Sequence, residues 1–109
     1  MKFISRSEEM FLLSIWKLKD NAYGVTIRET LKELTGETWA FGAIFITLDR
    51  LVKKGMLDSY LSDPTPERGG RSKRIYNLTD HGLEALEEIR KLQDNMWEGI
   101  SELKPEEIN

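Results

Sequence analysis

The chain has 109 residues, 39% of them hydrophobic and 32% charged, with a net charge of −3 and no cysteine. This balance suits a single globular domain with a modest core, and it excludes a disordered chain, disulfide bonds and thiolate metal sites. No apolar run approaches the roughly 18 residues that span a bilayer, and the N-terminus lacks a signal-peptide pattern. We therefore expect a cytoplasmic protein without a membrane partner.

The charges are unevenly distributed. Residues 1–78 hold 13 of the 16 basic and 10 of the 19 acidic side chains. Residues 79–109 hold the other 3 basic and 9 acidic side chains. Within residues 50–74 there are seven basic side chains and three acidic ones. A local basic patch matters more for DNA contact than the overall sum. The alternative is a charged surface that only solvates the fold.

Two helices are predicted in the first third of the chain. Ser5-Arg-Ser-Glu8 fits a capping box, and apolar residues at helical spacing follow it to about Lys19. After a turn at residues 20–24, a second capping box, Thr26-Ile-Arg-Glu29, opens a helix that should end before Gly36.

A third helix is predicted from about Ala40 to Lys54, with Thr38 as its N-cap. The stripe expected to pack consists of Phe41, Ile44, Phe45, Leu48, Leu51 and Val52. The residues expected on or near the other face are Ala43, Ile46, Thr47, Arg50 and Lys54. Two short helices joined by a tight turn, the second with small, polar and basic residues outward, are typical of a helix-turn-helix.

A basic hairpin should follow the third helix. We expect strands from about Met56 to Ser62 and from Lys73 to Leu78, because the prolines and glycines between them cannot continue a strand. Tyr76 should face the core. The hairpin resembles a wing, and its basic side chains are Arg68, Arg71, Lys73 and Arg74.

A long helix is predicted from Thr79 to about 103, before Pro105. Its apolar positions are Leu83, Leu86, Ile89, Leu92, Met96, Trp97, Ile100 and Leu103. No later segment can cover this face, so the N-terminal helix or a second subunit must do so. The fold class expected is therefore mainly α with a small β-hairpin. Residues 1–78 form a winged helix-turn-helix domain, and residues 79–109 form a C-terminal dimerisation helix.

These elements suggest contacts with double-stranded DNA. The candidates on and before the third helix are Thr38, Trp39, Ala43, Thr47 and Arg50. Thr38 could equally serve only as a cap, Trp39 could pack, and Arg50 could pair with a surface carboxylate. In the wing, Arg68, Arg71, Lys73 and Arg74 suit phosphate contact, since phosphates receive half or more of typical protein–DNA hydrogen bonds.

The helix–wing–helix run resembles the PadR-like family of bacterial winged-helix transcriptional regulators. The matching pieces are Gly42-Ala-Ile-Phe45, Leu48-Asp-Arg50-Leu51, Lys54-Gly55-Met-Leu57, Gly70-Arg71-Ser-Lys-Arg74, Tyr76-Asn-Leu78-Thr79, Gly82 and Leu86. The chain departs from the family at Phe45-Ile46, where the family usually has Tyr-Pro. That departure removes a hydroxyl that could reach a phosphate. The single terminal helix is similar to the short branch of the family.

The resemblance implies a homodimer that binds a pseudo-palindromic operator and represses a nearby gene. It also implies that a small aromatic or cationic effector binds between subunits, stacked on a tryptophan of the terminal helix. Trp97 is the residue that resembles this position, with Met96 and Trp16 as further lining residues. The alternative for Trp97 is a place in the dimer core.

Nothing in the sequence resembles an enzyme site. His81 is the only histidine and has only Asp80 beside it, so we expect neither a metal site nor a cofactor. The rival interpretation is a winged-helix protein–protein interaction module that does not bind DNA. The overall acidity and the apolar Phe45-Ile46 pair favour this rival.

Overall fold

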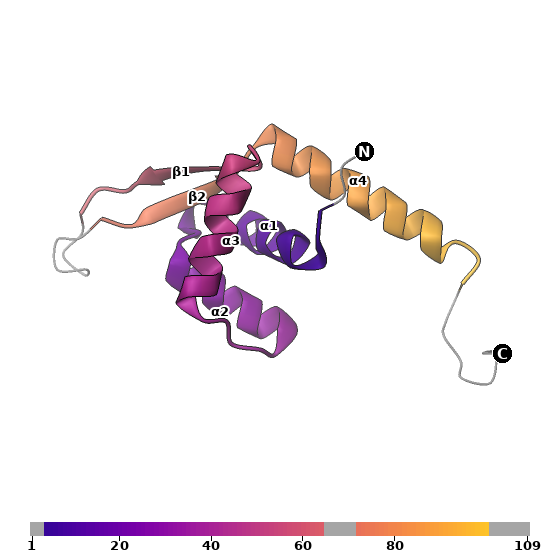
Figure 1. Ribbon diagram of the computed structural model, residues 1–109, viewed down its shortest axis with the longest axis horizontal. Helices are drawn as coiled ribbons and strands as arrows, with labels where there is room; N and C mark the ends of the chain where they lie inside the picture. Colours follow the sequence, from indigo (N-terminus) through magenta and orange to yellow (C-terminus); the bar gives the residue numbers. More distant parts are fainter. Residues whose placement is uncertain (1–3, 65–71, 101–109) are drawn as a thin grey trace.

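A computed structural model describes residues 4–64 and 72–100 of the chain. Its elements, in order, are α1 (Arg6–Leu18), a 3₁₀ turn η1 (Lys19–Asn21), α2 (Gly24–Thr35), α3 (Phe41–Lys53), β1 (Leu57–Leu61), β2 (Arg74–Leu78) and α4 (Asp80–Trp97). The three N-terminal helices form one body, from which the hairpin and α4 project in opposite directions (Figure 1). The predicted fold class, mainly α with a small β-hairpin, is confirmed.

The capping box predicted for α1 is present. The Ser5 hydroxyl accepts a hydrogen bond from the Glu8 amide at 3.1 Å, and the Glu8 carboxylate accepts one from the Ser5 amide at 2.9 Å. The box predicted for α2 is wrong, because that helix begins two residues before Thr26. The Thr26 hydroxyl instead accepts a hydrogen bond from the Tyr23 amide and donates one to the Asn21 carbonyl at 2.6 Å. It therefore ties the helix to the preceding turn.

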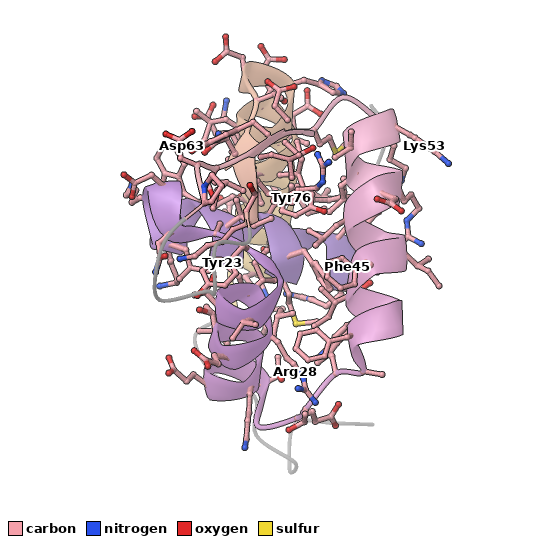
Figure 2. All side chains as sticks on the ribbon, turned by 90° about the vertical axis from the view of Figure 1, so that its left-hand side faces the viewer. Tyr23, Arg28, Phe45, Lys53, Asp63 and Tyr76 are labelled. Carbon is pink, nitrogen blue, oxygen red and sulfur yellow. The ribbon has the colours of Figure 1, made fainter. Side chains whose placement is uncertain are left out.

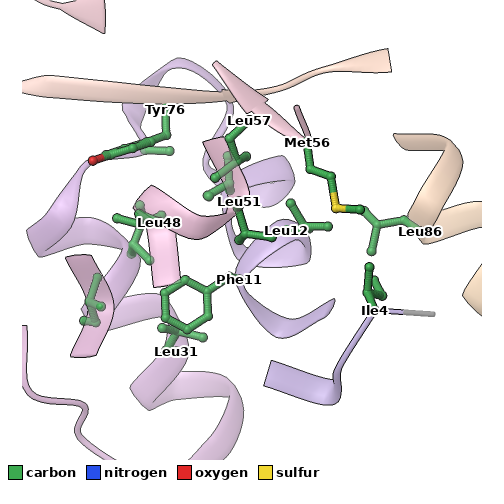
Figure 3. Packing of buried hydrophobic residues seen from close by; sticks show 14 of the residues in the cluster. Ile4, Phe11, Leu12, Leu31, Leu48, Leu51, Met56, Leu57, Tyr76 and Leu86 are labelled. Atoms are coloured by element: carbon green, nitrogen blue, oxygen red, sulfur yellow. The ribbon is translucent and has the colours of Figure 1, made fainter. Parts of the chain in front are cut away.

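The core lies where α1, α2, α3 and the hairpin meet. Its fully buried side chains include Phe11 and Leu12 of α1, Leu31 of α2 and Leu48 of α3 (Figure 3). Burying such apolar side chains stabilises a fold by about 1.5–3 kcal/mol each. This shared core fixes the orientation of α3 relative to the rest of the domain.

The hairpin is a two-stranded antiparallel sheet that continues directly from the end of α3. Leu57 pairs with Leu78, and Leu61 pairs with Arg74. The Tyr76 side chain is buried as predicted, and its backbone amide donates to the Ala22 carbonyl at 2.8 Å. The base of the hairpin is therefore held against the turn between α1 and α2.

The start of α4 is locked onto the end of α3. The Thr79 hydroxyl caps α4 by accepting from the Gly82 amide at 3.0 Å, and it donates to the Gly55 carbonyl at 2.6 Å. Gly82 lies so close to the Met56 carbonyl oxygen that a side chain there would collide with it. This close approach explains a glycine inside the first turn of a helix, where glycine otherwise weakens the structure.

The expected length of α4 was wrong. We predicted a helix to about residue 103, but α4 ends at Trp97. Glu98 leaves the helical conformation, Gly99 has a φ of +83°, and the Ile100 amide turns back to the Trp97 carbonyl at 2.8 Å. Glycine tolerates positive φ at helix ends, so Gly99 was the stop signal in the sequence. Leu103 lies outside the described residues.

Candidate nucleic-acid interface

One row of exposed residues runs along α3 directly opposite its buried side. We call the row Gly42, Ile46, Asp49 and Lys53 the outer face of α3; all four are exposed. Their spacing of four, three and four places them on one side of a helix, opposite the buried Ile44, Leu48 and Leu51. This face is available for contact with a flat or grooved partner such as DNA.

The outer face differs from the one predicted. Thr47 was expected to point outward, but it is only 7% exposed, and its hydroxyl donates to the Ala43 carbonyl at 3.0 Å. Thr38 was expected to cap α3, but Ala40 occupies that position without a side-chain bond. Thr38 and Ala43 are both exposed. Thr47 therefore faces the fold, while Thr38 and Ala43 remain open to a partner.

Arg50 is engaged with a buried carboxylate rather than with the surface acids considered from the sequence. Its Nε lies 3.3 Å from Glu8 Oε2, and Lys54 Nζ lies 2.6 Å from the same oxygen. The Glu8 side chain is only 5% exposed. Burial alone would raise its pKa, but the hydrogen bonds from Lys54 and Ser5 and the Lys54 charge outweigh burial and lower the pKa to about 2. Glu8 thus fastens the C-terminal end of α3 to the start of α1.

Trp39 packs instead of facing outward. Its ring meets Phe11 edge to face, with centroids 5.2 Å apart, and its indole Nε1 is buried without a hydrogen-bond partner among the described residues. The Trp39 carbonyl accepts from Arg28 Nε at 2.8 Å, and the Arg28 guanidinium lies 4.3 Å from the centre of the Phe41 ring. These contacts fix the turn that joins α2 to α3, so Trp39 positions α3 from within the fold.

The described part of the wing carries two basic side chains. Lys73 Nζ lies 4.5 Å from the centre of the Tyr23 ring, and Arg74 donates to the Ser59 hydroxyl at 3.1 Å. Arg74 is exposed and Lys73 is partly exposed, and both lie at the loop end of the strands, where Arg74 pairs with Leu61. The other two predicted wing residues, Arg68 and Arg71, lie outside the described residues.

A groove of about 420 Å³ separates α1 from α4. It is lined by Glu9, Leu13, Trp16, Leu83, Leu86, Glu87, Arg90 and Gln93. Trp16 therefore lies where a ligand between these helices could contact it. Met96 and Trp97 do not line the groove within one chain; they are 68% and 53% exposed at the end of α4.

Two negative findings concern the described residues only. They contain no cluster of three or more His, Cys, Asp or Glu side chains able to hold a metal ion. None of the helices in residues 4–64 and 72–100 is long and apolar enough to cross a membrane.

Residues 12–88 match the family described as Transcriptional regulator PadR-like. This match covers well over half of the chain. The chain belongs to the PadR-like family of transcriptional regulators. It is therefore a DNA-binding regulator and not an enzyme, and the resemblance seen in the sequence is confirmed.

Solved structures of other PadR-like proteins support the membership. A PadR family regulator from Clostridium difficile is 28% identical, with a TM-score of 0.64 and coverage of 85% of this chain and 92% of that one. A PadR-like regulator from Bacillus cereus is 26% identical, with a TM-score of 0.67 and coverage of 84% of each chain. The complex structure of hsRosR-S1, from H. salinarum, has a TM-score of 0.73 at 22% identity and covers 88% of this chain and 78% of that one. At this identity the likeness shows the fold alone. Among curated proteins, none matches this chain.

In this PadR-like winged helix, α2 and α3 form the helix-turn-helix and β1–β2 forms the wing. Two residues that the sequence did not single out have a place in this arrangement. Lys53 ends the outer face of α3 and was counted only within a basic stretch. Glu8 bonds side chains 42 and 46 residues away, and no local pattern could have indicated those partners.

Proposed function

We propose that this PadR-like regulator is a homodimeric repressor that places the outer face of α3 in the major groove of a pseudo-palindromic operator. The observation that carries the proposal is the position of that face. It is open to solvent, ends at Lys53, which projects away from the body (Figure 2), and belongs to the helix that leads directly into the wing. Helix-turn-helix dimers place two such helices about one DNA turn apart.

The roles of the individual side chains follow from their exposure. Thr38 and Ala43 lie beside the outer face near its start, and Lys53 stands at its end. Lys73 and Arg74 are placed to contact phosphates beside the groove. Arg50 contributes through the guanidinium nitrogens that do not face Glu8, since its side chain is 46% exposed. The predicted phosphate contacts of Arg68 and Arg71 belong to the same wing.

DNA binding is tested by mobility shift with the chain's own promoter at two salt concentrations. Affinity should fall steeply with salt, because each neutralised phosphate releases counterions. Lys53→Ala should weaken binding to all DNA sequences similarly. It should also reduce by about 1 the slope of the logarithm of the binding constant against the logarithm of the salt concentration. Lys91→Ala, on the exposed surface of α4, is the matched control and should leave the slope unchanged. A folded dimer that binds no DNA at low salt would favour the rival interaction module.

The proposed dimer uses α1 and α4. Both helices leave large apolar side chains exposed in the single chain: Leu13 and Trp16 on α1, and Met96 and Trp97 on α4, with Ile100 just after it. A second copy is the partner that would cover them, since a regulator that reads two half-sites must pair with itself. Sedimentation equilibrium should give twice the 12.7 kDa chain mass. Trp97→Glu should shift the monomer–dimer equilibrium toward the monomer. If the unmodified protein is itself a monomer, the proposed dimer is refuted.

The proposed effector is a planar aromatic cation held near the α1–α4 groove. Trp16 offers a ring there that already holds the Lys19 ammonium 4.0 Å from its centre, and the carboxylates of Glu9 and Glu87 outnumber the single cation Arg90 in the lining. Trp97 becomes a second stacking surface only if the partner subunit closes over the groove. The planar cation proflavine should quench tryptophan fluorescence, and Trp16→Phe and Trp97→Phe variants should show which ring responds. No change across a panel of planar cations would remove the effector from the proposal.

A further inference from the structure

The first two turns of the outer face of α3 present only apolar side chains. Gly42 has open space where a side chain would project, and Ile46 is 67% exposed. The neighbouring Ala43 adds one methyl group. The single polar side chain in these turns, Thr47, is buried and bonded to the Ala43 carbonyl. A major groove that receives this part of α3 meets no side-chain amide, hydroxyl or guanidinium group on that surface.

Ile46 is the most prominent side chain of that surface. The nearby Phe45 is drawn back against α2, since a side chain at Gly24 would lie only 3.0 Å from the Phe45 ring. Figure 2 shows Phe45 between the two helices, whereas Lys53 projects from the far end of α3. With glycine and alanine beside Ile46, the helix backbone can approach a groove floor closely.

The charges around this apolar surface indicate DNA rather than a protein as its occupant. Arg28 and Lys32 line a hollow with Thr38 at the start of α3, where Glu29 is the acidic residue of the lining. Lys53 and the partly exposed Lys54 stand at its other end. Gly42 and Lys53 are 11 residue steps apart, which corresponds to about 16 Å along the helix axis. Asp49 is the acidic member of this row, one turn beyond Ile46, but the cations at the two ends outnumber it and match phosphates on the two sides of a groove.

Thymine is the base whose major-groove edge suits an aliphatic side chain. Its C5-methyl group is the apolar group of that edge, whereas the other bases present donors and acceptors. An isoleucine placed against those polar groups would displace water without replacing its hydrogen bonds, which costs free energy. We propose that Ile46 is a specificity-determining residue that selects thymine through its C5-methyl group. This inference rests on the proposed function, namely that α3 enters the major groove.

The test begins with the full-length protein and a randomised duplex library. Selection should enrich a site with at least one fixed thymine in each half-site. That duplex is then resynthesised with deoxyuridine at each thymine in turn, which removes the methyl group and keeps the base pair. Binding should weaken about fourfold at the thymine that Ile46 contacts, the effect expected for one buried methyl group.

A double-mutant cycle separates the methyl contact from changes in DNA shape. Ile46→Ala should weaken binding to the thymine site and abolish the response to deoxyuridine at that position. Deoxyuridine at the other thymines should affect both proteins equally. Circular dichroism should show an unchanged fold, because Ile46 is exposed.

The possible results are distinct. If Ile46→Ala and deoxyuridine act additively at every position, the inference is overturned, while salt-dependent binding keeps the proposed function. A selected site without any fixed thymine also overturns the inference alone. If no duplex binds at low salt, the proposed function itself fails.

Discussion

Replacement of Glu8 by glutamine should loosen the attachment of α3 to α1. Glu8 is buried and receives hydrogen bonds from the Ser5 amide, Lys54 Nζ and Arg50 Nε. The substitution keeps the shape of the side chain and removes its charge. Two cations of α3 then lose their partner, and the glutamine amide cannot accept all three bonds.

The magnitude follows from the lowered pKa of Glu8. The pKa falls from 4.5 to about 2 on folding, and each pKa unit corresponds to about 1.4 kcal/mol. The charged form therefore stabilises the fold by at most about 3 kcal/mol above pH 4.5. Because the pKa is lowered, this contribution is lost as the pH falls from 4.5 through 2. At pH 3 about 2 kcal/mol of it should be gone.

Urea unfolding at pH 7 and pH 3 measures the effect, with chain concentration held constant because a dimer's stability depends on it. The free energy of unfolding of the unmodified protein should exceed that of the Glu8→Gln variant by about 3 kcal/mol at pH 7 and by about 1 kcal/mol at pH 3. Glu84→Gln is the control, since the Glu84 side chain is exposed and forms no hydrogen bond or ion pair with the described residues. A difference between the unmodified protein and Glu8→Gln that is the same at both pH values would refute the reasoning.

Two further predictions concern the junction of α3 and α4. Gly82→Ala should lower the free energy of unfolding by about 2 kcal/mol or more, because the new methyl group would collide with the Met56 carbonyl. Gly42→Ala, where the methyl group meets nothing, should be neutral or stabilising; equal losses in both variants would contradict the steric argument. Thr79→Ala should cost about 1–2 kcal/mol in urea unfolding, because α4 loses its cap and its bond to the preceding turn. An unchanged unfolding midpoint would show that the cap does not stabilise the junction.

Local patterns in the sequence predicted the elements well. The α1 capping box, the end of α2 at Gly36 and the paired strands depend on neighbouring residues, and the structure has all of them. Errors arose where a local signal had more than one use. Thr26 and Thr38 both looked like caps, yet Thr26 binds the preceding turn and Thr38 is simply exposed.

The candidate site was less predictable because it depends on how α3 is rotated. Helical spacing identified an apolar stripe, but the stripe was too wide to fix which edge packs. Ile46 faces outward as predicted, but tertiary contacts bury Thr47, which was expected beside it. Arg50 offered another ambiguity, since an arginine suits DNA or a carboxylate equally, and only the folded chain brings Glu8 to it.

The sequence alone thus determined the helix-turn-helix, the wing and the family, because these follow from short-range periodicity, turn residues and their spacing. Only the tertiary structure decided that Thr47 is buried and that the outer face is apolar at its start and charged toward its end, with Asp49 and then Lys53. The physical reason is that burial and ion pairing join residues far apart in the chain. Glu8 and Lys54, 46 positions apart, illustrate this through the 2.6 Å contact that fastens α3 in place.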